Sequence, residues 1–304
     1  MDREISGVLI IDKPARMTSH DVVIHVRRLL GTRQIGHFGT LDPFATGVLP
    51  LSAGKATRFA QFYLKSRKAY EGTMRFGFST DTYDGTGAPT SNQVQVSVEA
   101  AELEILFREF TGRLMQTPPA YSAKRIGGAR AYDLARQNKP VQLEPVEVEV
   151  YAFELLAAEG ERARFAVECS GGTYVRSLAH DIGQKLGCGA HLEDLRRTAV
   201  AEFTLDRSTT LEGLAAVREE NLQSCLVPLE ALLPDCPELV VRGREEKNVR
   251  HGHRFELGQT ERFGRGTGRL QAVTLLKIMN PERRLIAVAR HVAGSIYHPD
   301  LVLV

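Results

Sequence analysis

The sequence has no apolar run long enough to cross a bilayer and no internal repeat or low-complexity tract. Its start, Met1-Asp2-Arg3-Glu4, lacks the charged and then apolar order of a signal peptide. The first absence excludes a protein anchored by membrane-spanning helices. Together they lead us to expect a cytoplasmic location.

Cysteines are also few, and they are scattered. The chain has four, Cys169, Cys188, Cys225 and Cys236, and no two of them form a CxxC pair, so neither a disulfide framework nor a zinc knuckle is indicated. Cys188 and His191 have the spacing of metal ligands, but further ligands to complete a set are not evident. We therefore expect small, buried thiols and no metal site.

Excess charge is absent as well, since the net charge is only +2. Any nucleic-acid partner must therefore be bound by local basic patches, because the field of the whole protein is weak. The chain has 304 residues, of which 43% are hydrophobic and 25% charged, as in an ordinary globular protein. This length predicts a large core and two domains.

The most distinctive stretch that is present covers residues 36–50, with the sequence GHFGTLDPFATGVLP. Its three glycines and two prolines exclude a regular helix and predict a shaped loop that enters a short apolar strand at Val48–Leu51. Asp42 is the one acid in this stretch. A carboxylate that is fixed on a rigid loop and open to a ligand suits a nucleophile or an ion-pairing group.

A purely structural interpretation of Asp42 is also available. Asp followed by Pro commonly starts a helix, with Asp as the N-cap and Pro at the first helical position. Gly47 and Pro50 argue against this interpretation, because they would break a helix that began at Pro43.

Hydrophobic periodicity predicts alternating strands and helices along the first 232 residues. Strands are expected at Gly7–Ile11, Lys68–Phe78, Val146–Tyr151 and Arg162–Cys169, the last two as a pair around a turn near Gly160. Helices are expected at Ser19–Leu30, Lys55–Leu64, about 103–110, about Tyr174–Leu186, and near Leu211–Glu220, the last opened by a capping box of Thr209 and Glu212.

Residues 116–132, QTPPAYSAKRIGGARAY, differ in kind from the elements around them. Lys124, Arg125 and Arg130 are interleaved with Tyr121 and Tyr132 on a Gly- and Pro-rich segment. Basic and aromatic side chains in such a segment suit the clasping of single-stranded or loop RNA. Composition alone is equally compatible with a solvated surface loop.

The pattern changes near Pro234–Pro237, after which strands become short and glycine-rich turns frequent. The one helical signal in this part is Gly243–Val249. We place a domain boundary at about residue 233, which gives domains of residues 1–232 and 233–304.

Several of these segments, in order along the chain, resemble the TruB family of pseudouridine synthases. The stretch 36–50 resembles the family's active-site motif. Because this match is long, it arises by chance far less often than a match to a short, loose pattern. Further matches are Lys13-Pro14 after the first strand, Tyr70 in its strand motif, Gly172–Arg176 and Leu195–Thr198.

The resemblance implies roles for individual residues. Asp42 would be the catalytic carboxylate and Arg176 its guanidinium partner, while Tyr70 would stack on the uracil, since an unperturbed phenol titrates near ~10 and is a poor base at neutral pH. Leu195, Tyr174 and Lys13 would contact the RNA, and His37 would fill the space left by flipped nucleotides. Without the resemblance, Tyr70 is ordinary core, Arg176 and Lys13 are surface charges, and His37 is a hydrogen-bonded structural residue.

The implied fold is α+β: a catalytic domain with a mixed, mostly antiparallel sheet flanked by helices, followed by a small β-barrel like the PUA RNA-binding module. The implied function is cofactor-free isomerisation of uridine 55 in the T-loop of tRNA, by base flipping, in a monomer without an obligate protein partner. Two alternatives remain: a guide-RNA-dependent catalytic subunit, and an RNA-binding or tRNA-folding protein in which Asp42 is structural.

Overall fold

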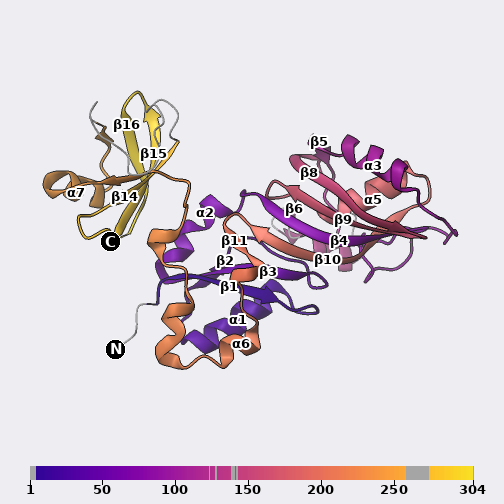
Figure 1. The fold of residues 1–304 in the computed structure, drawn as a ribbon, viewed down its shortest axis with the longest axis horizontal. Coiled ribbons are helices and arrows are strands. Elements are labelled where there is room, and N and C mark those ends of the chain that lie inside the picture. The colour runs from indigo at the N-terminus through magenta and orange to yellow at the C-terminus, as the bar shows by residue number, and fades with distance from the viewer. Residues whose placement is uncertain are drawn as a thin grey trace.

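The computed structural model describes residues 5–122, 124–126, 129–137, 141, 143–257 and 274–303. It contains a nine-stranded sheet, a separate five-stranded sheet and a two-stranded hairpin (Figure 1). The nine strands are β1 (Gly7–Lys13), β2 (Ile35–His37), β3 (Thr46–Ala53), β4 (Lys68–Phe76), β5 (Gly112–Gln116), β8 (Val146–Glu159), β9 (Arg162–Cys169), β10 (Ala190–Val200) and β11 (Phe203–Thr204).

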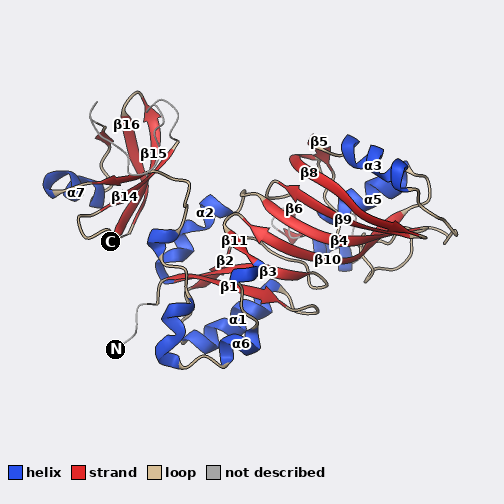
Figure 2. Cartoon of the chain, viewed as in Figure 1, coloured by secondary structure: helices blue, strands red, loops and turns tan. Residues whose placement is uncertain are grey.

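Helices flank this sheet (Figure 2). They are α1 (Ser19–Leu30), α2 (Ala60–Tyr63), α3 (Ala100–Glu109), α4 (Ala131–Arg136), α5 (Val175–Lys185) and α6 (Leu211–Ala215), with 3₁₀ turns η1 (Gly54–Phe59), η2 (Leu205–Arg207), η3 (Glu219–Cys225) and η4 (Leu229–Ala231). Helices α3 and α5 contribute to one buried core with strands β4, β8, β9 and β10, whereas α1 and α6 pack in a second core with β1 and β3.

The large sheet has the order β1-β3-β10-β4-β9-β8-β5, with β2 paired to β3 and β11 to β10. Its pairs are antiparallel except β3 with β10, where Arg196 and Arg197 lie beside Thr46 and Gly47. The predicted mixed, mostly antiparallel sheet is therefore confirmed. The parallel pair also brings two segments that are 150 residues apart to the same place, next to the loop that carries Asp42.

Strand β4 shows how the alternating pattern becomes structure. Tyr70, Met74 and Phe76 are buried on the face covered by helices, while Glu71 is exposed and Thr73 partly exposed, as the period of two predicts. Phe78 lies beyond the end of the strand.

Helix α1 begins and ends where the sequence predicts. The Thr18 side chain accepts a hydrogen bond from the Asp21 backbone, and the Asp21 carboxylate accepts one from the Thr18 backbone, which completes a capping box. Gly31 ends the helix in the left-handed conformation, with φ 63°.

Three local expectations are corrected by the structure. Residues 55–64 form a 3₁₀ turn followed by one α-helical turn, not one continuous helix. Helix α6 ends at Ala215 and its N-cap is Thr210, whose oxygen accepts from Gly213, because the Thr209 backbone is held in pairing with Ile10. Segment 116–132 is not wholly a loop, since β6 (Arg125–Ile126) pairs with β7 (Ala129–Arg130) and α4 follows.

The five-stranded sheet lies at the C-terminal end, where it curls into the small barrel-like unit expected (Figure 1). It contains β12 (Glu238–Val240), β13 (Phe255–Glu256), β14 (Leu275–Met279), β15 (Leu285–Ala293) and β16 (Ile296–Val302), with helix α7 (Gly243–Arg250) beside it. It has its own core around Ile278 and Tyr297, and it also shares a hydrophobic cluster with Phe59 and Phe203 through Leu301. In the part of the chain that the structure describes, no helix is long and apolar enough to cross a membrane.

Candidate active site

Asp42 lies on the loop that joins β2 to β3, and the backbone on both sides of it is tied down. The Ser19 hydroxyl, at the start of α1, accepts a hydrogen bond from the Leu41 backbone at 2.8 Å and donates one to the Leu41 carbonyl at 3.0 Å. Both groups are buried. The first turn of helix α1 therefore holds the residue directly before Asp42.

Arg197, on β10, binds the backbone before Asp42 and at the start of β3. Its side chain is fully buried and donates to the carbonyl oxygens of Val48 at 2.8 Å, Thr40 at 3.2 Å and Gly39 at 3.1 Å. Gly47 must be glycine here, because a Cβ atom would lie 2.2 Å from the Arg197 carbonyl oxygen and φ is 102°. Because Arg197 holds the loop backbone at three carbonyl oxygens, the backbone that carries Asp42 has a fixed position.

Lys13, at the end of β1, is a third support. Its side chain is buried and its ammonium group donates to the carbonyl oxygens of Pro14 and Met17 at 2.8 Å and of Pro43 at 3.3 Å. Burial lowers the pKa of this amine to about 8. With three carbonyl acceptors around one ammonium group, this arrangement favours positioning of the loop over the predicted contact with RNA, and it rules out the solvated surface charge.

The charged partner of Asp42 is Arg176. The guanidinium forms two hydrogen bonds with the carboxylate, from Nε to Oδ2 at 2.9 Å and from Nη2 to Oδ1 at 3.1 Å. The Arg176 side chain is 5% exposed and that of Asp42 is 34% exposed. The interpretation of Arg176 as a surface residue is therefore wrong, and the open side of the pair is the carboxylate.

Arg176 makes further contacts with three other residues, of which the sequence had singled out only Tyr121. Nη1 donates to the Thr82 carbonyl at 2.8 Å and lies 3.5 Å from Oδ2 of Asp84, which is buried. Nη2 also donates to the Tyr121 carbonyl at 3.0 Å. Arg176 therefore lies between two carboxylates, those of Asp42 and Asp84. Asp84 also accepts a hydrogen bond from the Thr82 hydroxyl at 2.8 Å. The one signal for Asp84 was its place in the polar stretch 81–85.

Tyr70 and Leu195 lie on neighbouring strands beside this pair. Tyr70 is opposite Arg197 in the register of β4 and β10, and both Tyr70 and Leu195 are buried in the same cluster as Leu41. Burial raises the pKa of the Tyr70 phenol to about 12. A phenol with this pKa is protonated at neutral pH, which argues against proton abstraction by Tyr70 and favours packing against a base.

His37 and Tyr174 are two further candidate residues, one at the end of β2 and one directly before α5. Nδ1 of His37 accepts a hydrogen bond from the Gly39 backbone at 3.2 Å, and burial lowers the pKa of its imidazole. Tyr174 precedes α5 and is fixed by the Gln116 amide, which accepts from the Tyr174 backbone at 2.8 Å and donates back at 3.0 Å. Burial raises the pKa of the Tyr174 phenol.

The basic residues of segment 116–132 are placed in part. Nζ of Lys124 donates to the Glu144 carbonyl at 3.2 Å, and the bond is exposed. The side chains of Arg125 and Arg130 lie outside what the structure describes, although their backbones form β6 and β7. The segment contacts the candidate site through the Tyr121 carbonyl, which accepts from Arg176, and through the Gln116 side chain, which fixes Tyr174.

The site is built for charge stabilisation by one carboxylate. Among the residues that the structure describes, no group of three His, Cys, Asp or Glu side chains gathers to hold a metal ion. The available groups are an accessible carboxylate, a buried guanidinium that orients it, and the Tyr70 ring, which lies close enough to Asp42 for the two to interact electrostatically. Such a set can stabilise or trap a positively charged carbon.

Comparison with known proteins gives a consistent picture. Residues 27–175 match the model of the TruB family pseudouridylate synthase (N terminal domain), and residues 176–234 match the tRNA pseudouridylate synthase B C-terminal domain. The chain is 47% identical to tRNA pseudouridine synthase B of Solibacter usitatus, over 98% of this chain and 100% of that protein. It is 41% identical to the protein of the same name from Aquifex aeolicus, over 83% of this chain and 87% of that one.

Solved structures agree with these matches. The chain superposes on a structure titled as a Cbf5-Nop10-Gar1 complex with a TM-score of 0.72 and 28% identity, over 96% of this chain and 80% of that one. A structure titled as an H/ACA RNP bound to a substrate RNA containing 2′-deoxyuridine gives a TM-score of 0.72 at 27% identity, over 97% and 84%.

Proposed function

This chain belongs to the TruB family of pseudouridylate synthases, and from that premise we propose that it isomerises uridine 55 in the T-loop of tRNA without a cofactor, with Asp42 as the catalytic carboxylate. The observation that carries the proposal is the ion pair between Asp42 and Arg176, which has two hydrogen bonds. Asp42 lies on a loop whose backbone is held by Ser19, Lys13 and Arg197. Asp42 lies in the stretch 36–50 that resembles the family's active-site motif, and Arg176 lies in the separate match at Gly172–Arg176.

The chemistry fits a single carboxylate. Conversion of uridine to pseudouridine breaks the N1–C1′ bond, turns the base and forms the C5–C1′ bond, so no electrons, water or phosphate are consumed. An ionised Asp42 can bond covalently to the nucleoside or stabilise a cationic sugar carbon. The guanidinium of Arg176 orients the carboxylate through two hydrogen bonds of 2.9 and 3.1 Å.

The target base must leave its stack before it can reach Asp42. Tyr70, Leu195 and Tyr174 then form the walls against which the uracil packs, with Tyr70 in a stacking role because its phenol is held protonated. His37, the last residue of β2 and so directly before the loop, fills the space that the flipped nucleotides leave. The RNA backbone is bound by Lys124, Arg125 and Arg130 of segment 116–132.

In this proposal the two large sheets belong to domains with different roles. We assign catalysis to residues 1–232 and additional tRNA binding to residues 233–304, which carry the PUA-like five-stranded sheet. The T-arm stem-loop then contacts both, in an enzyme that acts as a monomer in the cytoplasm.

One alternative rests on a specific observation, the superposition on Cbf5 structures at 25–28% identity. A guide-RNA-dependent catalytic subunit would share the fold. The identity of 39–47% to proteins named tRNA pseudouridine synthase B, over most of this chain, favours the stand-alone enzyme. The other alternative, an RNA-folding protein with a structural Asp42, predicts binding without chemistry.

Tritium release from C5-labelled uridine tests the proposal. The purified full chain alone, in the presence of a metal chelator, is expected to release tritium from a bare T-arm stem-loop and from a tRNA transcript, and to place pseudouridine at position 55. Activity that requires a guide RNA and protein partners would select the first alternative. Tight tRNA binding with no release from any tRNA would select the second.

A further inference from the structure

The short helix α2 lies on the side of the large sheet that faces the C-terminal sheet (Figure 1). Its last residue, Tyr63, is 1% exposed, and its ring belongs to a hydrophobic cluster that is built from both sheets. The part of the chain that carries the candidate active site contributes Phe38 and Phe203 to this cluster, and the C-terminal sheet contributes Val288 and Leu301. The mechanism above does not use Tyr63.

The ring of Tyr63 packs directly on the loop that carries Asp42. Phe38 is the first residue of this loop, and it is fully buried. The rings of Tyr63 and Phe38 are stacked, with centroids 4.5 Å apart and planes at 13°, and the Phe203 ring lies 5.9 Å from Phe38 and 5.2 Å from Tyr63. Arg197 binds the carbonyl oxygen of the residue after Phe38 at 3.1 Å. The start of the loop is therefore held by a ring stack and by a buried cation at adjacent residues.

The hydroxyl of Tyr63 contacts the segment that leads into the C-terminal sheet. It donates a hydrogen bond to the Glu202 carboxylate and accepts one from the Leu233 backbone at 2.9 Å. Burial and the nearby Glu202 carboxylate raise the pKa of this phenol, so the hydroxyl keeps its proton and remains a donor. Leu233 has a φ of 54°, a left-handed conformation that is unfavourable for leucine, and the bond to Tyr63 helps to hold it there.

The C-terminal sheet is fixed against the same cluster. Leu301, on β16, is 2% exposed and packs in it. Two hydrogen bonds cross the boundary near residue 233: Arg58 of η1 donates to the Val302 carbonyl, and the buried Lys277 of β14 donates to the Glu230 carbonyl at 2.9 Å. A displacement of the C-terminal sheet would expose this shared core to water and would shift the groups that hold Tyr63.

One side chain therefore contacts the loop of Asp42 with its ring and the domain boundary with its hydroxyl. We propose that Tyr63 is a positioning residue for this loop, and that the C-terminal sheet contributes to the rate of the chemical step by holding Tyr63 in place. A misplacement of a catalytic group by about 1 Å can lower a rate about 100-fold, so a loosened ring stack is enough for a measurable effect. The inference rests on the proposed function, since the rate is that of pseudouridine formation.

Single-turnover formation of pseudouridine at saturating tRNA, with full-length variants, tests the role of the ring. Tyr63→Leu removes the stack and should lower the rate about tenfold while the tRNA dissociation constant stays within about twofold. Tyr63→Phe keeps the ring, and the Leu233 backbone keeps the Glu202 carboxylate at 3.3 Å as an acceptor. Tyr63→Phe should therefore retain the wild-type rate within about twofold. A merely structural Tyr63 would lower the free energy of unfolding without changing the rate of the folded protein.

A double-mutant cycle shows whether the ring acts through Phe38. Phe38→Leu removes the same stack from the side of the loop, so the double variant Phe38→Leu/Tyr63→Leu should be no slower than the slower of the two single variants. Rate losses that multiply in full would contradict a role through the stack.

A matched pair of leucines tests the contribution of the C-terminal sheet. Leu301→Ala loosens the shared cluster, whereas Leu276→Ala makes the same change in the sheet's own core, where Leu276 is fully buried. Both variants should lose comparable stability, but Leu301→Ala should also lower the single-turnover rate roughly threefold, while Leu276→Ala leaves it unchanged.

An unchanged single-turnover rate in folded Tyr63→Leu would overturn the role of the ring. Equal rates for Leu301→Ala and Leu276→Ala would overturn the contribution of the C-terminal sheet, and this pair decides the proposal if Tyr63→Leu does not fold. Both results differ from failure of the proposed function, in which the wild type forms no pseudouridine in any tRNA.

Discussion

Two sets of basic residues in this protein illustrate opposite uses of charge. Under the catalytic loop, Lys13, Arg176 and Arg197 are buried, and each binds backbone carbonyls or a carboxylate at fixed distances. In segment 116–132, by contrast, Lys124 is part-exposed and donates a hydrogen bond to the carbonyl oxygen of Glu144. Buried cations position the chemistry, whereas exposed cations remain available to bind a polyanion.

The largest effect that separates these two sets is expected at Arg176. Arg176→Ala removes both bonds to Asp42, so kcat should fall roughly 100-fold or more while the tRNA dissociation constant changes little. Single-turnover rates and filter binding measure the two quantities. Arg113→Ala, which removes an exposed arginine from the same sheet, is the control and should change neither. A change mainly in RNA affinity would move Arg176 into the RNA-binding set.

Strand β10 allows a buried and an exposed arginine to be compared directly, because Arg197 is fully buried and its neighbour Arg196 is partly exposed. Arg197→Met leaves one buried and two part-buried carbonyl oxygens without their donor and should lower the free energy of unfolding by about 3 kcal/mol. Arg196→Met removes an ion pair with Asp12 whose side chains are 41% and 26% exposed, and should cost about 1 kcal/mol or less. Urea denaturation compares them. Equal losses would contradict the proposed support of the loop by Arg197.

The exposed set is tested through salt. Neutralising Lys124 and Arg130 together, each to Gln, should weaken tRNA binding and make the slope of log affinity against log salt shallower by roughly one unit or less for each lost phosphate contact. Affinities between low and physiological salt give the slope, with Arg113→Gln as the control. An unchanged slope would show that segment 116–132 does not bind phosphates.

The smallest effect concerns a carboxylate without the cation that Asp42 has. Burial raises the pKa of Asp181 on α5 to about 6, so its ionised form is disfavoured in the fold. The stability it contributes is present below the unfolded pKa, near ~4, and is lost as the pH rises through 6. Asp181→Asn should therefore raise the free energy of unfolding at pH 7.5 by about 1 kcal/mol.

That gain should disappear at pH 4, because the wild-type carboxyl is then largely neutral in the fold. Asp206→Asn, in a turn with an exposed acid, is the control and should show no such pH dependence. A gain that persists at pH 4 would contradict the role of burial at Asp181.

The sequence allowed much of the fold to be predicted, for identifiable reasons. The caps of α1 and the alternation of β4 are local patterns, and the structure has both. The N-cap of α6 was assigned one residue early because adjacent threonines are alike in sequence, and pairing with β1 decided between them. Arg176 and Lys13 were singled out only through the family resemblance, since hydrophobic periodicity alone treats a charged residue as a surface residue, whereas the structure buries both side chains.

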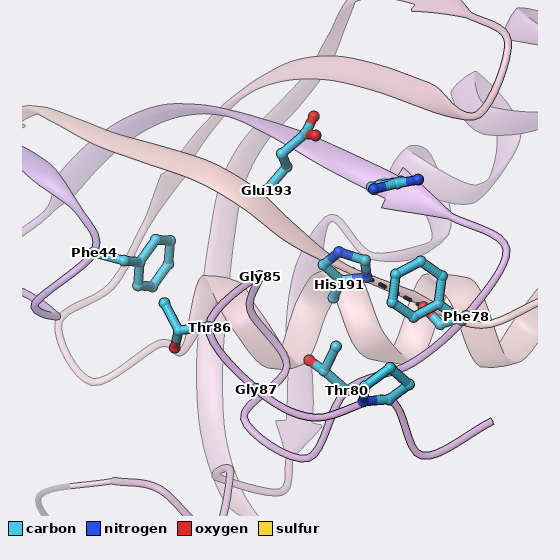
Figure 3. Close-up of a pocket in the computed structure, with 10 residues that line it drawn as sticks. Phe44, Phe78, Thr80, Gly85, Thr86, Gly87, His191 and Glu193 are labelled. Atoms are coloured by element: carbon cyan, nitrogen blue, oxygen red, sulfur yellow. Dashed lines mark hydrogen bonds between the residues drawn. The ribbon is translucent and has the colours of Figure 1, made fainter. Parts of the chain in front are cut away.

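Asp84 could not be predicted, because its contact with Arg176 depends on how a turn 92 residues earlier in the chain folds onto α5. A cavity of about 430 Å³ that is lined by Phe44, Phe78 and His191 (Figure 3) was missed for the same reason, since four separate segments build it. Local pattern indicates which residues a strand or helix buries, but not which distant side chains meet.

The central claim is that the carboxylate of Asp42 performs the chemistry while the surrounding cations only position it. Tritium release from C5-labelled uridine in tRNA by Asp42→Asn, measured together with tRNA binding and thermal unfolding of the same preparation, tests this most directly. The account predicts that release falls to background while the dissociation constant stays within a few-fold and the variant unfolds cooperatively. Release within tenfold of the wild-type rate, from a folded variant that binds tRNA, would contradict it.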